Sequence, residues 1–338
     1  MSKLVFQLDQ NPFDDIRDLI ARVPAANPDV RKAAMSRQAE IALPSGELGR
    51  LAELAIWLAS WQGQNPPKVE RPQIVVFASS HGIAERGVSA YGSAETQAKI
   101  DALTSGKGSV NQIAGTAGCG LQIVELAPEL PTPDITEQAA LSEKECAATF
   151  AFGMEAVSSN PDLIGLGVVG AGATTAAGAV SLALYGGAAS FWAMSGSAMK
   201  KPDLLVAKTK VIDDALIHHR GKLDDPLEVM RRLGGRDLAA VAGAIIAARY
   251  QNIPVILDGF VATASAAILH AIDPNCIDHC VAGSVTSRDS HHALLDRIGK
   301  KPVLDLGLGL GDGSGAALAI SIAKAAAACH VGIGHGQN

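Results

Sequence analysis

Residues 164–180, IGLGVVGAGATTAAGAV, run from an apolar stretch through a glycine-rich turn into an alanine-rich segment. A strand, turn and helix in this order direct backbone N–H groups and the positive end of the helix dipole at one point, which suits a phosphate. The segment 310–319, LGDGSGAALA, repeats the pattern and has Ser314 at the expected helix start. Taken alone, either segment is better explained as a tight turn with a capped helix and no ligand.

The two segments differ from the common nucleotide-binding motifs. Neither contains the Gly-Lys-Ser/Thr of a Walker A loop. The stretch GVVGAG at 167–172 has a G-x-x-G-x-G arrangement, but no acidic residue follows about twenty positions later to bind a ribose, so dinucleotide binding is disfavoured. A third loop, SSHGIAERGVSAYG at 79–92, also follows an apolar run. Three such loops at one edge of a sheet together favour a ligand site.

Six short apolar runs carry these loops at the spacing of an α/β protein. The runs are continuous rather than alternating, as strands buried on both faces require. They lie at residues 74–79, 121–127, 163–169, 254–259, 279–285 and 302–310. The prediction is an α/β fold with a doubly wound, mostly parallel six-stranded sheet of Rossmann-like type. Ligands of such sheets bind beyond the carboxyl ends of the strands, where the three loops are expected.

The two ends of the chain predict a smaller helical lobe. Residues 16–23 and 48–61 place apolar side chains at i, i+3 and i+4 spacing, which indicates helices, and a connector with three prolines follows at 62–73. The predicted division is a lobe of residues 1–70 joined by the C-terminal helix of residues 311–338, and a main domain of residues 71–310. The large apolar face of 48–61 predicts burial against a second subunit, and hence a homodimer.

Composition points to a small-molecule partner. The formal net charge of −6 and the lack of a Lys/Arg cluster give no basic field for nucleic acid. The first fifteen residues lack the apolar core of a signal peptide. The longest uncharged stretch, 163–199, is interrupted by Gly, Ser and Thr, so no membrane contact is expected. We therefore expect a cytoplasmic protein.

The five cysteines are odd in number and scattered, which favours free thiols over disulfides. In NCIDHC, Cys276, His279 and Cys280 lie within five residues. Three possible ligands so close could open a zinc site, but no second pair completes one. Ordinary packing of buried thiols is the favoured interpretation. We expect no metal.

Four segments resemble the nicotinate-nucleotide–dimethylbenzimidazole phosphoribosyltransferase family, which makes the lower-ligand nucleotide of cobalamin. They are FASSHGIAERGVSAYG, GVVGAGATT, the long block from Leu223 to Leu269, and LGLGLGDGSGAALA. The resemblance runs in unbroken order from about residue 12 to residue 330. It implies transfer of 5-phosphoribose from nicotinate mononucleotide to 5,6-dimethylbenzimidazole or a related base, giving α-ribazole phosphate and nicotinate, with no cofactor.

The resemblance also implies the site residues. Asp312 falls on the catalytic glutamate of the family's LGEGSG. The implied substrate-binding set is Ser80, His81, Ser89, Tyr91, Val168, Gly170, Gly172, Thr174, Thr175, Lys208, Thr286, His291, Leu310, Gly313 and Ser314. The family's third loop reads approximately GEMGIGNTT, so Val168 stands where a carboxylate is expected and Ala173 replaces an asparagine. The glycines of a backbone cradle remain while its polar side chains are lost.

Two interpretations of Asp312 stay open. It is either the base that takes the azole N–H proton or a cap for the last helix. As a base it is one methylene shorter than the expected glutamate, about an ångström of reach, which can cost about a hundredfold in rate. The alternatives for the whole protein are a catalytically impaired homologue that binds a nucleotide or base, alone or as a partner subunit, and a transferase with a changed acceptor.

Overall fold

In the computed structural model, six parallel strands form one sheet in the order β2-β1-β3-β4-β5-β6. The strands are β1 (Pro72–Ala78), β2 (Gly120–Glu125), β3 (Leu163–Val169), β4 (Val255–Asp258), β5 (Cys280–Ser284) and β6 (Pro302–Leu304). The structure describes residues 11–44, 46–89, 92–158, 160–194, 202–285 and 289–335. The predicted six-stranded sheet is confirmed, and every strand pair described is parallel.

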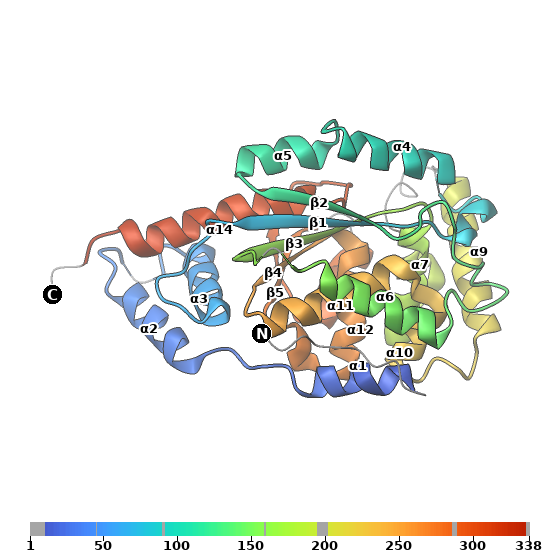
Figure 1. Ribbon diagram of the computed structural model, residues 1–338, viewed down its shortest axis with the longest axis horizontal. Helices are drawn as coiled ribbons and strands as arrows, with labels where there is room; N and C mark the ends of the chain where they lie inside the picture. The colour runs from blue at the N-terminus through green and yellow to red at the C-terminus, as the bar shows by residue number, and fades with distance from the viewer. Residues whose placement is uncertain are drawn as a thin grey trace.

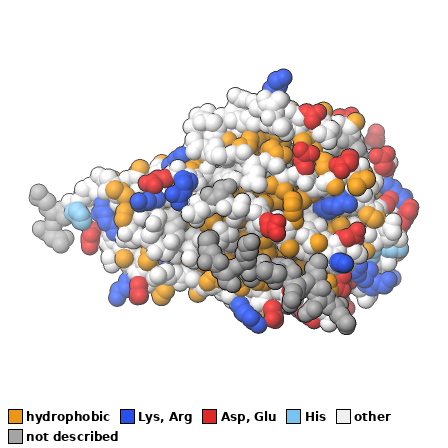
Figure 2. Space-filling view, in the orientation of Figure 1, with side chains coloured by type: hydrophobic (Ala, Val, Ile, Leu, Met, Phe, Trp, Pro, Cys, Tyr) orange, Lys and Arg blue, Asp and Glu red, His pale blue; other side chains and the backbone are white. Residues whose placement is uncertain are grey.

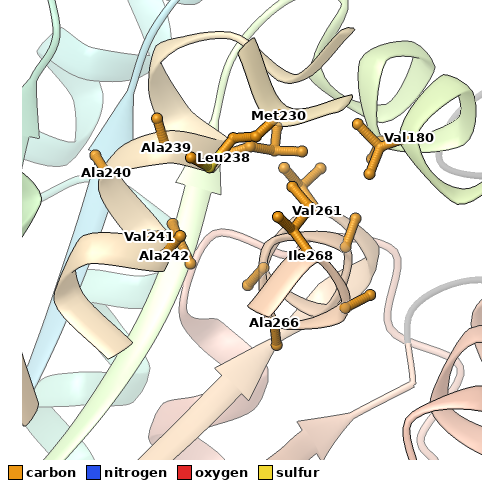
Figure 3. Close-up of a cluster of buried hydrophobic side chains, with 14 of the residues drawn as sticks. Val180, Met230, Leu238, Ala239, Ala240, Val241, Ala242, Val261, Ala266 and Ile268 are labelled. Carbon is orange, nitrogen blue, oxygen red and sulfur yellow. The ribbon is translucent and has the colours of Figure 1, made fainter. Parts of the chain in front are cut away.

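One face of the sheet carries the larger part of the core. It is covered by α6 (Glu143–Glu155), α7 (Ala173–Tyr185), α11 (Arg236–Tyr250) and α12 (Gly259–Ile272), with α1 (Pro12–Ala21) against α6. Figure 3 shows Val180 of α7, Leu238 of α11 and Val261 and Ile268 of α12 converging between these helices. Because α11 and α12 are apolar almost all round, both are buried among neighbours on several sides.

The opposite face is covered by α3 (Arg50–Gln62), α4 (Ser93–Thr104), α5 (Ser109–Ala117) and α14 (Ser314–Gly332). The first turns of α14 pack on the sheet through Ala316, Ala317 and Ile320. Farther along, Ala326 packs against Leu54 and Ala55 of α3. Helix α14 therefore reaches from the sheet to the N-terminal helices at the end of the molecule (Figure 1). Helices on both faces make the sheet doubly wound, as predicted.

The remaining helices surround this three-layer arrangement. They are α2 (Pro28–Ala39), α8 (Ala189–Trp192), α9 (Pro202–His218), α10 (Pro226–Val229) and α13 (Asp289–Arg297), with a π-helix at Met230–Gly234 and short 3-10 turns at Gly82–Arg86 and Pro274–Ile277. By length and composition, α14 is the one helix in the described ranges that could cross a membrane, and half of it is buried in the fold. Its contacts with the sheet are those of a core helix.

The helices at the N-terminus follow the predicted spacing. Helix α1 buries Phe13, Ile16 and Ile20, and Asn27 caps α2 by accepting hydrogen bonds from two backbone N–H groups. We predicted a homodimer from the apolar face of residues 48–61. In the structure, α14 of the same chain packs against this face of α3. On the face in Figure 2, acidic and basic side chains are interspersed.

Candidate active site

The strand order reverses between β1 and β3, and the loops after these two strands run side by side. The Ser79 N–H donates to Val169 O at 3.1 Å, and the His81 N–H donates to Ala171 O at 3.2 Å. Ligands of open α/β sheets bind at such a reversal, beyond the carboxyl ends of the strands. The backbone therefore joins two of the three predicted loops where a ligand would bind.

Two predicted residues of the first loop lie inside the protein. His81 is 1% exposed, and its Nε2 donates to Oδ2 of the equally buried Asp237, at the start of α11. Ser80 is fully buried, and its Oγ has no hydrogen-bond partner among the described residues. His81 thus has a structural partner, whereas the Ser80 hydroxyl has none among the described residues.

The glycine-rich loop after β3 leads directly into α7. Gly172 has φ +86° and precedes the first residue of the helix. Thr174 accepts a hydrogen bond at 3.1 Å from the ammonium of Lys208 on α9. Thr175 is buried, and its Oγ1 has no hydrogen-bond partner in the described part of the chain. A helix N-terminus, an adjacent cation and an unpaired hydroxyl suit an anionic group such as phosphate.

Lys208 is 1% exposed, which is unusual for a lysine. Burial lowers the pKa of its ammonium to about 7, because the charged form loses its hydration. An anion beside Thr174 would favour the charged form. Binding of an anion at this position would therefore stabilise the protonated, charged form of Lys208.

The loop between β6 and α14 brings Asp312 over the end of β3. The Val168 N–H donates to Gly311 O at 2.9 Å. A side chain on Gly167 would clash with the backbone of Asp312 and Gly313, so this close approach requires glycine. Val168 itself is 6% exposed and belongs to the core on the α11 side of the sheet.

Asp312 is half-buried and makes two hydrogen bonds. Its Oδ1 accepts from the Ser314 N–H at 3.1 Å, and its Oδ2 accepts from Ser109 Oγ of α5 at 3.0 Å. Ser314 is buried, and its hydroxyl lies 3.3 Å from that of Ser109. Asp312 thus supports the start of α14, as the capping interpretation requires, yet it stays accessible enough to accept a proton.

Sequence analysis missed Asp258, the last residue of β4. Its side chain is 1% exposed, and it accepts hydrogen bonds from the N–H groups of Gly313 and Gly315 and from Ser284 Oγ. Burial raises the pKa of Asp258 to about 6, the negative charge of Asp312 adds to this, and the three hydrogen bonds oppose it. The signal was present in PVILDG, where one carboxylate ends an apolar strand.

The other predicted residues are more dispersed. Ser89 is half-buried after the 3-10 turn at Gly82–Arg86, and Leu310 is 49% exposed on the loop before Asp312. His291 is fully buried on α13, and its Nε2 lies 2.9 Å from Thr263 Oγ1 of α12. Burial lowers the pKa of His291 to about 3, so its imidazole is neutral. Tyr91 and Thr286 lie outside the described residues.

The cysteine and histidine cluster has the surroundings of a packed core. Cys276 and Cys280 are buried, and burial raises the pKa of each thiol to about 12. His279 donates from Nε2 to Ile245 O at 2.9 Å. Within the ranges that the structure describes, no group of three or more His, Cys, Asp or Glu side chains could hold a metal ion. The residues gathered at the carboxyl edge are suited instead to binding an anion and accepting a proton.

Comparison with known proteins places these features in a family. A family model described as "Phosphoribosyltransferase" matches residues 23–337. The nicotinate-nucleotide–dimethylbenzimidazole phosphoribosyltransferase of Methylocella silvestris is 51% identical over 299 residues, which cover 88% of this chain and 87% of that protein. The enzyme of the same name from Rhizobium etli is 48% identical over 296 residues, covering 88% of this chain and 87% of its own. A crystal structure of such an enzyme from Thermus thermophilus matches with a TM-score of 0.82 at 31% identity, covering 90% of this chain and 96% of that chain.

Proposed function

Since this chain belongs to the nicotinate-nucleotide–dimethylbenzimidazole phosphoribosyltransferase family, we propose that the carboxyl edge of its sheet is the active site and that Asp312 is the base. The protein is a pentosyltransferase that moves 5-phosphoribose from nicotinate mononucleotide to 5,6-dimethylbenzimidazole or a related base. The products are α-ribazole phosphate and nicotinate, and the reaction belongs to cobalamin biosynthesis.

The reaction requires little acid catalysis. The C1′–N bond breaks, and its electron pair neutralises the positive charge of the departing pyridinium ring, so nicotinate leaves without a proton donor. One azole nitrogen attacks C1′ from the opposite face, which inverts the anomeric configuration. The proton on the other azole nitrogen must leave, and Asp312 accepts it in our proposal. Holding the two substrates in line supplies much of the remaining acceleration.

The single observation that carries this assignment is the position of the Asp312 carboxylate. Each of its oxygens accepts one hydrogen bond, from Ser314 N–H and Ser109 Oγ, which leaves lone pairs for a proton. The carboxylate lies on the turn packed on Gly167, two residues before the end of β3. Asp312 therefore acts in our proposal both as a support for α14 and as the base.

We assign the phosphate of the nucleotide to the start of α7. Gly170 and Gly172 form the turn that leads into the helix, Thr174 and Thr175 supply hydroxyls there, and Lys208 supplies a positive charge. The exposed Leu310, two residues before Asp312 on the same loop, provides apolar surface for the aromatic acceptor. The unpaired hydroxyls of Ser80 and Thr175 support a polar ligand between the loops after β1 and β3.

We further propose a homodimer in the cytoplasm, with no nucleic acid or membrane partner. The helical lobe, residues 1–70 with the C-terminal helix at 311–338, is the part that we assign to the subunit contact. Exposed Met35, Leu43 and Val331 lie in this lobe and support the assignment. Sedimentation equilibrium at micromolar concentration tests it, and a monodisperse monomer would contradict it.

Product analysis tests the proposed function. The purified protein is incubated with nicotinate mononucleotide and with dimethylbenzimidazole, unsubstituted benzimidazole, adenine or a phenol, and nicotinate release and the anomeric configuration of the product are measured. We expect an α-configured product with an azole and a loss of about 10²-fold in kcat for Asp312→Asn. Asp305→Asn is the matched control, because Asp305 is an exposed carboxylate on the same loop.

Three results would change the assignment. An Asp312→Asn variant as active as wild type would remove Asp312 from the role of base. Turnover with phenols alone would indicate a changed acceptor. Nucleotide binding without turnover for every acceptor would favour the catalytically impaired homologue, whose support is the capping role of Asp312 and the apolar surroundings of Val168.

A further inference from the structure

Asp258 is a buried carboxylate that the reaction as described does not use. Its Oδ2 accepts hydrogen bonds from the N–H groups of Gly313 at 2.8 Å and Gly315 at 3.1 Å. Its Oδ1 accepts from Ser284 Oγ, at the end of β5, at 3.0 Å. A Cβ on Gly315 would clash with both Ser284 Oγ and Asp258 Oδ1, so the chain is shaped to let this carboxylate reach the backbone.

The two backbone donors lie directly beyond Asp312. Gly313 has φ +97° and is the N-cap residue of α14, and Gly315 is in the first turn of the helix. A negative charge at this end of a helix is favoured by the helix dipole. The Asp258 carboxylate, at the end of β4, therefore holds both Gly313 and Gly315 through their backbone N–H groups. The orientation of the Asp312 side chain depends on this anchor, since its own bond to the Ser314 N–H uses the same turn.

Charged groups also surround this turn. The negative charge of Asp312 adds to the effect of burial in raising the pKa of Asp258. Burial lowers the pKa of Lys99 on α4, and the negative charge of Asp312 opposes that shift. The groups that bond Asp258 directly are all neutral: two backbone N–H groups and one hydroxyl.

We propose that Asp258 is a positioning residue for the transfer: its hydrogen bonds to Gly313 and Gly315 fix the turn that carries Asp312 and so hold the Asp312 carboxylate in place. This inference rests on the proposed role of Asp312 as the base. It assigns to the end of β4 a function that requires no contact with either substrate.

The test is steady-state kinetics of Asp258→Asn in the wild-type and Asp312→Asn backgrounds. In the wild-type background we expect kcat to fall by about 10-fold to 100-fold, because the base is displaced. The KM for each substrate should stay within about twofold. In the Asp312→Asn background the same change should alter the residual kcat by less than about twofold.

Asp162→Asn is the matched control. Asp162 also accepts two backbone hydrogen bonds, from the N–H groups of Glu70 and Arg71, but at the amino end of the strands. We expect it to lower the melting temperature without lowering kcat. If Asp258→Asn does not fold, Ser284→Ala tests the inference instead, because it keeps the Asp258 carboxylate and removes one of its three hydrogen-bond donors. Ser284→Ala should lower kcat severalfold in the wild-type background and leave it unchanged in the Asp312→Asn background.

Several outcomes overturn the inference. One is a folded Asp258→Asn or Ser284→Ala variant with the kcat of wild type. Another is an equal loss of kcat in both backgrounds, which is the signature of a merely structural role. If instead Asp312→Asn alone retains full activity, the assignment of the base has failed, and that result is read independently of any change at Asp258.

Discussion

The guanidinium of Arg249 lies over the indole of Trp61, with its carbon 3.9 Å from the ring centroid. Arg249 is 3% exposed at the end of α11, and its Nε donates to Pro24 O at 2.5 Å. The contact joins α11, which packs on one face of the sheet, to α3, which packs on the opposite face. This buried cation thus links the N-terminal helices to α11.

We expect Arg249→Lys to lower the free energy of unfolding by about 2 kcal/mol. The lysine ammonium keeps the positive charge. It cannot stack on Trp61 as the planar guanidinium does, and it lacks the Nε donor that bonds Pro24 O. Differential scanning calorimetry measures the change. Arg22→Lys is the control, since Arg22 forms an exposed pair with Asp18 and should have little effect. Equal melting temperatures for the two variants would show that the contact between Arg249 and Trp61 does not stabilise the protein.

A second prediction concerns the buried pair of His81 and Asp237. His81→Ala leaves the Asp237 carboxylate buried without its ring partner, and we expect a loss of about 3–5 kcal/mol. The surface pair of His335 and Glu40, 3.5 Å apart, provides the control, and His335→Ala should change stability by less than about 0.5 kcal/mol. Urea denaturation gives both values. A small loss for His81→Ala would mean that water or a ligand group replaces the ring.

Lys208 predicts a pH dependence of nucleotide binding. Burial sets the pKa of its ammonium at about 7 in the free protein, and a bound phosphate favours the charged form. Binding therefore takes up a proton above pH 7, and Kd rises by up to about tenfold per pH unit there. Isothermal titration calorimetry with nicotinate mononucleotide at pH 8, in two buffers of different ionisation enthalpy, measures the proton uptake.

The control for that measurement is Lys210→Met. Lys210 is an exposed lysine on the same helix, paired with Asp214, and its removal should leave the proton uptake unchanged. Lys208→Met should abolish the uptake and weaken binding. Proton uptake that persists in Lys208→Met would assign the titration to another group.

The sign of the same shift predicts an effect on folding. The pKa of Lys208 is lowered on folding, so between pH 7 and the unfolded value of 10.5 the unfolded chain binds more protons at this residue. The contribution of Lys208 to stability therefore rises with pH across that window. Lys208→Met should flatten the rise of the melting temperature with pH between 7 and 9, and an unchanged slope would contradict the buried charge.

Asp312→Glu separates the two roles of Asp312. The longer side chain restores about an ångström of reach, so we expect a higher kcat with dimethylbenzimidazole. It also moves the carboxylate away from the Ser314 N–H, and we expect the free energy of unfolding to fall by about 1 kcal/mol. Initial rates of nicotinate release and thermal melts of one preparation test both. A lower kcat would show that the shorter side chain suits this loop.

The strands were predictable from sequence because residues buried on both faces give continuous apolar runs. The predicted run at 163–169 is β3 itself, and 254–259 contains β4. The last run, 302–310, was predicted too long, because β6 ends at Leu304. Glycines follow at alternate positions, and Gly307 and Gly311 adopt positive φ, which turns the chain away from the sheet.

The site was less predictable, because its decisive contacts join distant parts of the chain. Asp258 bonds residues 55 and 57 positions away, and His81 bonds Asp237, 156 positions away. No local pattern reports such partners. The glycine loops and Asp312 were found because their spacing is local, whereas the partners of Asp258 and Asp237 are identified only when the strand ends are assembled.

Helix α14 gives the molecule a mechanical property. Its 19 residues span about 28 Å. The first turn is tied to Asp258, while near the other end His330 is bonded to Gln38 and Asn65. A packed helix resists compression along its axis, so α14 keeps the N-terminal helices and the turn at Gly313 a fixed distance apart. The helix is a rigid spacer between those helices and the loop that carries Asp312.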